Sequence, residues 1–143
     1  MTTGLFTKIL VATDGSDKNR AAVDEGLRIG RACGVPVHVV YVADISALES
    51  GSPDLMIGST WEMVLREGEK ALARIRDMAG DVALETVILE GKPAAEIVRY
   101  AREKEIDLIV IGTQGKRGIE RILLGSVAES IIRTAPCKVL VVK

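Results

Sequence analysis

Short, uninterrupted apolar runs constrain the fold of this chain more than any other feature of its sequence. The clearest is LIVI at residues 108–111, where aliphatic side chains follow one another without polar alternation. Such a run is typical of a strand that lies in a parallel sheet and is covered on both faces. We predict strands in five segments: residues 8–13, 36–42, 82–89, 108–112 and 138–142.

Helical patterns separate these strands. A first helix is predicted over residues 17–33, where small residues make a smooth stripe that allows close packing on a sheet. The stripe consists of Ala22, Gly26 and Gly30. A second helix follows a loop rich in Ser, Gly and Pro, and Pro93 occupies a favourable first-turn position in the third. The β-α alternation predicts an α/β fold, with one domain over residues 1–143 built on a doubly wound five-stranded parallel sheet with helices on both faces.

Composition excludes several functional classes. The 19 basic and 20 acidic residues give a net charge of -1, which argues against a general binder of nucleic acid or of membrane surfaces. No N-terminal stretch resembles a signal peptide, and no run approaches the roughly 20 apolar residues of a membrane-spanning helix. We therefore expect a soluble, cytoplasmic protein without a membrane or nucleic-acid partner. Because only 3% of the residues are aromatic, its core is expected to be aliphatic.

A glycine-rich, basic segment follows the run at residues 108–111. Its glycines are Gly112, Gly115, Gly118 and Gly125, and its basic residues are Lys116, Arg117 and Arg121. Glycines let backbone N–H groups approach a ligand without a Cβ in the way. Ser126 is suited to N-cap a helix that continues through Val127, and the unpaired N–H groups at a helix start favour an anion. We predict that this segment binds a polyphosphate.

Spacing separates this segment from two common phosphate-binding motifs. GxGxxG is absent because the glycines fall three residues apart. GxxxxGK[ST] is absent because Pro93 and Arg117 stand where Ser or Thr is required. The pattern that is present is GxxGx9GS, made by Gly112, Gly115, Gly125 and Ser126. Single members keep a simpler interpretation, since glycines often only form turns and Lys116 and Arg117 can be solvated charges.

This spacing, after a strand and before a helix, resembles the nucleotide-binding signature of the universal stress protein family, in its ATP-binding branch. The resemblance covers nearly the whole chain. Asp14 and Ser16 match the family's VxxDxS element, while VHVVYVAD and APCKVLVVK resemble its second and closing strands. The resemblance implies the strand order 3-2-1-4-5.

The implied order places the ligand. Ligands of doubly wound sheets bind at the carboxyl ends of the strands, where the order reverses, here between strands one and four. That reversal puts Asp14 beside Gly112 and Gly115. The apolar walls expected for an adenine are Ala12, Val42 and Ile111. The family's adenine contact maps to the backbone of Val42, and Asp44 could hold the base or ribose. The expected phosphate contacts are Gly112, Gly115, Lys116, Arg117, Gly125, Ser126 and Val127.

Two functional classes follow. The first is an ATP-binding, cytoplasmic stress-response protein that acts as a nucleotide-dependent switch, with Asp14 holding Mg²⁺ through the phosphates unless it only caps the first helix. The second is a slow ATPase or an enzyme of the adenine-nucleotide hydrolase type. No motif supplies a general base, and the SGGxDS pyrophosphatase loop is absent from TDGSDKN. These absences favour the switch.

The remaining predictions concern assembly and isolated reactive side chains. In the implied order, Lys138–Val142 is an apolar strand on an open sheet edge, and pairing with a second copy would cover it. The resemblance implies the same homodimer; any other protein partner stays unknown. Cys33 and Cys137 match no metal-binding spacing and are expected to be reduced thiols. His38 lies inside a predicted strand and is expected to be structural.

Overall fold

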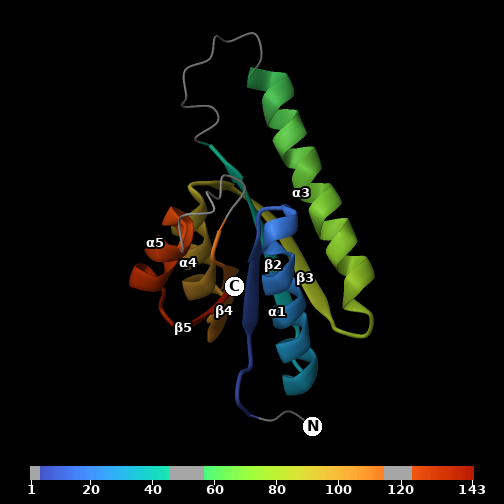
Figure 1. Ribbon diagram of the computed structural model, residues 1–143, viewed down its shortest axis with the longest axis vertical. Helices are drawn as coiled ribbons and strands as arrows, with labels where there is room; N and C mark the ends of the chain where they lie inside the picture. Colours follow the sequence, from blue (N-terminus) through green and yellow to red (C-terminus); the bar gives the residue numbers. More distant parts are fainter. Residues whose placement is uncertain (1–3, 46–56, 115–123) are drawn as a thin grey trace.

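The computed structural model describes residues 4–45, 57–114 and 124–143. Its strands form one parallel sheet in the order β3-β2-β1-β4-β5, as Figure 1 shows. The strands are β1 (Ile9–Thr13), β2 (Val37–Asp44), β3 (Leu84–Gly91), β4 (Leu108–Gly112) and β5 (Lys138–Val142). The helices are α1 (Arg20–Cys33), α3 (Ile57–Ala79), α4 (Pro93–Glu103) and α5 (Ser126–Thr134), with a 3₁₀ turn, η1, at Asp17–Asn19. The predicted fold class and strand order are confirmed.

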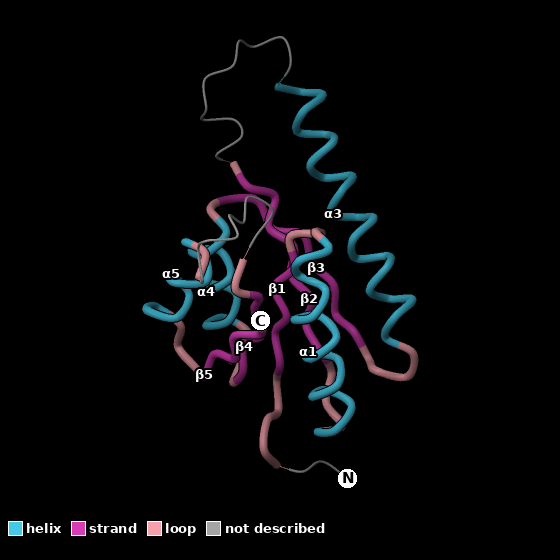
Figure 2. The backbone as a smooth tube through the Cα atoms, in the orientation of Figure 1, coloured by secondary structure: helices cyan, strands magenta, loops and turns pink. Residues whose placement is uncertain are grey.

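Helices cover both faces of the sheet. Residues of α1 and α3 pack with one set of buried strand residues, which includes Val11 and Val110. Residues of α4 and α5 pack with the other set, which includes Leu10 and Ile109. Figure 2 shows the two helical layers on opposite sides of the strands. The unbroken apolar runs of β1, β2 and β4 therefore belong to central strands with both faces buried, as their lack of alternation predicts.

The small-residue stripe of α1 lets that helix approach the sheet closely. A Cβ on Gly26 would overlap Cγ2 of Val11, and one on Gly30 would overlap Cγ2 of Val37. In α3, a Cβ on Gly68 would lie 2.6 Å from Cδ1 of Tyr41. Only glycine fits these positions without a shift of the strand side chains.

The ends of several elements differ from the predicted ones. Residues 17–19 form the 3₁₀ turn, and the α-helix begins at Arg20. β2 and β3 each continue two residues past their predicted ends, because their parallel pairing persists to Asp44 opposite Gly91. Ladder pairing is a long-range contact that local sequence patterns do not report. None of the helices in the described ranges combines the length and apolarity needed to cross a membrane.

Candidate functional site

The reversal of strand order lies between β1 and β4. From β1 the chain enters α1 on one face of the sheet, whereas the segment after β4 leads to α5 on the other face. The turn that follows β1 and the residues that follow β4 therefore meet at the carboxyl ends of two neighbouring strands. This is the position where doubly wound sheets bind ligands.

The turn after β1 is tied together by Asp14. Its Oδ1 accepts hydrogen bonds from the Ser16 N–H at 2.9 Å and from Ser16 Oγ at 2.6 Å. Gly15 has a φ of +81°, and its N–H donates to Oγ1 of Thr13 at 3.1 Å. Nη2 of Arg74, on α3, donates to the carbonyl of Gly15 at 3.3 Å. Asp14 thus orders the turn through Ser16 and does not act as the N-cap residue of η1 or α1.

Asn19 occupies the junction between this turn and β4. Its side chain is 6% exposed and makes no capping hydrogen bond, although Asn19 is the N-cap residue of α1. Nδ2 lies 3.2 Å from the position that a Cβ on Gly112 would take. Oδ1 is buried and has no hydrogen-bond partner within the described ranges. The sequence analysis did not identify this residue; its only local signal is an amide in the first turn after VxxDxS.

The two ends of the glycine-rich segment converge. The N–H of Gly125 donates to the carbonyl of Thr113 at 2.6 Å, which ties the start of α5 to the residue that follows β4. The prediction that Ser126 is the N-cap of this helix is wrong. Gly125, with φ -70° and ψ 162°, is the N-cap, and Ser126 is the first helical residue. The predicted contacts Gly115, Lys116 and Arg117 lie outside the described residues.

The predicted adenine walls share one face of the sheet. Ile111 is buried in the cluster that α4 and α5 cover, and Ala12 and Val42 pack against that cluster. Val127, on α5, is 40% exposed. Asp44 ends β2, opposite Gly91 of β3. The structure thus places three apolar side chains from three adjacent strands on the same face of the sheet, on both sides of the reversal; their contact with a base stays a prediction.

Charge at the start of α5 is balanced within the helix. Glu129 lies in its first turn, where a carboxylate competes with a bound anion. Arg133 Nη2 contacts Glu129 Oε1 at 2.6 Å and partly neutralises it. In the described residues, no cluster of three His, Cys, Asp or Glu could hold a metal ion. A cation at the predicted nucleotide site would therefore need oxygen atoms of the bound nucleotide in addition to those of the protein.

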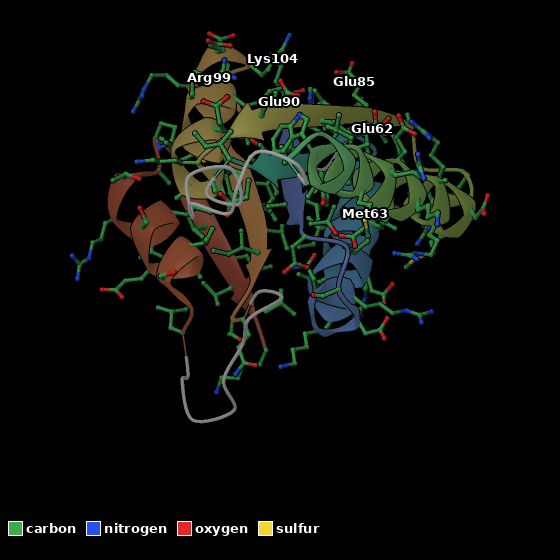
Figure 3. All side chains as sticks on the ribbon, turned by 90° about the horizontal axis from the view of Figure 1, so that it is seen from above. Glu62, Met63, Glu85, Glu90, Arg99 and Lys104 are labelled. Carbon is green, nitrogen blue, oxygen red and sulfur yellow. The ribbon has the colours of Figure 1, made fainter. Side chains whose placement is uncertain are left out.

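A separate cavity of about 390 Å³ lies at the amino ends of the strands. His38, Glu85, Glu103 and Lys104 are among its lining residues, and Figure 3 shows Glu85 and Lys104 on the same side of the molecule. His38 Nδ1 lies 2.8 Å from the Tyr100 hydroxyl, so the histidine has a buried partner. Asp14 and Gly112 lie at the carboxyl ends of the strands, so this cavity at the amino ends forms no part of the predicted nucleotide site.

Comparison with known proteins identifies relatives along nearly the whole chain. The model of the universal stress protein family matches residues 5–143. A universal stress protein of Methanocaldococcus jannaschii is 43% identical over 145 residues, covering 97% of this chain and 83% of the relative. The structure of the universal stress protein UspA from Lactobacillus plantarum superposes with a TM-score of 0.81 at 29% identity, covering 96% of this chain and 98% of that one.

Two structural neighbours contain adenine nucleotides. A universal stress protein from Archaeoglobus fulgidus, in complex with dAMP, has a TM-score of 0.65 at 28% identity and covers 97% of this chain and 99% of its own. A universal stress protein in complex with cAMP has a TM-score of 0.66 at 29% identity, with 96% of each chain covered.

Proposed function

This chain belongs to the universal stress protein family, and we propose that it binds ATP at the carboxyl ends of β1 and β4 and acts as a nucleotide-dependent switch in a cytoplasmic stress response. The observation that carries the proposal is the 2.6 Å hydrogen bond between Gly125 and Thr113. It brings the first and last parts of GxxGx9GS to one place, at the reversal of strand order. The dAMP and cAMP complexes of structural neighbours support an adenine nucleotide.

Different residues would contact the adenine, the phosphates and the cation. Ala12, Val42 and Ile111 offer an apolar wall for the flat faces of an adenine, on the face covered by α4 and α5. The backbone N–H groups at the start of α5 and the glycines of the segment suit the phosphates. Asp14 would hold Mg²⁺ together with phosphate oxygens. Because Asp14 Oδ1 already accepts two hydrogen bonds from Ser16, its Oδ2 is the oxygen that we assign to the cation.

The output of a switch is a conformation or a partner contact rather than a product. No motif in the sequence supplies a general base, and the turn that holds Asp14 is ordered by its own hydrogen bonds. We therefore expect any ATP hydrolysis to be far slower than the roughly 10 s⁻¹ of a median enzyme. A phosphate-release assay on the wild type and Asp14→Ala separates the two classes, because rapid, Asp14-dependent turnover would establish the enzyme instead.

Thermal unfolding with and without Mg·ATP tests binding directly. At a free ligand concentration of 100 Kd, binding stabilises the folded state by about 2.7 kcal/mol, or a melting shift on the order of 5–10 °C for a chain of this size. We expect Gly115→Val to lose the shift and Lys116→Ala to reduce it. Lys104→Ala is the matched control, because Lys104 lines the cavity at the opposite edge. A wild type that shows no shift in millimolar Mg·ATP would refute the proposal.

We further propose that two copies pair through β5. β5 is an edge strand in the sheet, paired with β4 on one side. Four of its five residues are half-buried apolar side chains: Val139, Leu140, Val141 and Val142. Natural proteins cover, charge or pair such an edge, and a two-fold axis would run the two β5 strands antiparallel.

A further inference from the structure

Asn19 is a buried polar side chain whose acceptor oxygen, Oδ1, has no hydrogen-bond partner among the residues that the structure describes. The residue is only 6% exposed, so water has little access to this unpaired oxygen. Buried carbonyl oxygens are nearly always paired in native proteins, because an unmet acceptor loses its hydration without recovering a bond. An acceptor of this kind that persists in a fold needs a physical explanation.

The position of Asn19 links it to the reversal of strand order. Its backbone N–H donates to the carbonyl of Ser16 at 3.2 Å, and Ser16 in turn donates to Asp14. On the other side, Nδ2 faces Gly112, 3.2 Å from the position of the missing Cβ. The carboxamide therefore lies between the turn that contains Asp14 and the first glycine of GxxGx9GS.

The chemistry of the carboxamide restricts what could pair with it. Its Nδ2 is a donor and its Oδ1 an acceptor. A bare phosphate offers only acceptor oxygens and could satisfy Nδ2 but not Oδ1. A phosphate that carries a hydrated divalent cation offers both kinds of partner, since the waters of Mg²⁺ donate and Mg²⁺ usually keeps several of them.

We propose that Asn19 contacts the cation-loaded phosphates of the bound nucleotide, with Oδ1 accepting from water on the divalent cation and Nδ2 donating to a phosphate oxygen. This inference rests on the proposed function, and it adds a residue that distinguishes Mg·ATP from metal-free ATP. Asp14 supplies the negative charge on the same turn, whereas Asn19 supplies a neutral acceptor that does not repel the phosphates.

Isothermal titration with two ligands, Mg·ATP and ATP in excess EDTA, tests the proposal. We expect Asn19→Ala to weaken Mg·ATP binding about tenfold while changing the affinity for metal-free ATP much less, as loss of one hydrogen-bonded partner predicts. Asn19→Asp keeps acceptor oxygens and should keep the preference for Mg·ATP. Cys33→Ala, a truncation in the last turn of α1 at a residue with 2% exposure, is the control for general damage to the helix.

Unfolding of the ligand-free proteins provides the second measurement. Asn19→Ala removes an unpaired acceptor, so its melting temperature should be no lower than that of Cys33→Ala. A much lower melting temperature, or an equal loss of affinity for both ligands, would assign Asn19 a structural role and overturn the inference. If Asn19→Ala does not fold, Asn19→Ser takes its place. Its affinities for Mg·ATP and for metal-free ATP are then compared with those of the wild type in the same way. A wild type that binds ATP without preferring Mg·ATP removes this inference alone, whereas one that binds neither form removes the proposed function as well.

Discussion

At the scale of single residues, His38 makes the stability of the fold sensitive to pH. Its ring is buried against the Tyr100 hydroxyl, and Glu85 Oε2 lies 3.3 Å from Nδ1. Burial lowers the pKa of His38 below 6.5, and the attraction of Glu85 opposes this only in part. The folded state therefore favours the neutral ring. Below pH 6.5 the unfolded chain binds the proton more readily, so stability declines as pH falls from 6.5 toward the lowered pKa.

Urea unfolding of the wild type and of His38→Gln, at several values between about pH 5 and 7.5, measures this effect. The wild type should lose stability on acidification with a slope of at most about 1.4 kcal/mol per pH unit. His38→Gln has no proton to gain at this position and should show a flatter profile. Parallel profiles for the two proteins would show that other groups cause the pH dependence.

At the scale of elements, α1 can pack closely against β1 because Gly26 has no side chain. Gly26→Ala should destabilise the protein by about 1–3 kcal/mol, because the added Cβ overlaps Cγ2 of Val11. This penalty opposes the roughly 1 kcal/mol that alanine gains over glycine in a helix. Val11→Ala removes the overlapping methyl groups, so the double variant should be more stable than the sum of the two single changes predicts. Strict additivity in chemical denaturation would contradict this account of the contact.

The same scale shows which elements the sequence could predict. Every strand follows from apolar runs such as LIVIG, and Pro93 correctly indicates the start of α4. The predicted start of α5 is one residue late, because Gly125 and Ser126 are both acceptable N-caps by residue type. The backbone decides between them, and the extended ψ of 162° at Gly125 makes Ser126 helical.

At the scale of the whole molecule, the open edge at β5 predicts a homodimer in sedimentation experiments at micromolar concentration. In a strand, neighbouring residues direct their backbone groups alternately to the two sides. Of the variants Leu140→Pro and Val141→Pro, one should therefore remove a donor to β4 and damage the fold, and the other should remove a donor at the open edge and yield a folded monomer. Circular dichroism identifies which is which. A monomeric wild type would rule out pairing through this strand.

The arrangement of the whole chain explains why Asn19 could not be predicted from the sequence as part of the candidate site. The strand order came from resemblance to a family, since apolar runs identify strands but not their neighbours. Asn19 becomes buried only because β4, ninety residues further along the chain, lies beside the turn after β1. No local sequence pattern around Asn19 predicts that β4 approaches it. Asp14 and Gly112, by contrast, belong to VxxDxS and GxxGx9GS, two motifs that are visible in the sequence.

The hydrogen bond between Gly125 and Thr113 has a consequence for evolution and for engineering. Because it anchors α5 directly to the residue after β4, we expect the sheet and its helices to keep their register when side chains between the two anchors change. Leu124 is excepted, because it packs against the core under α4 and α5. Grafting residues 115–123 from a relative should therefore transfer that relative's nucleotide preference, as titration of the grafted protein with nucleotides would measure.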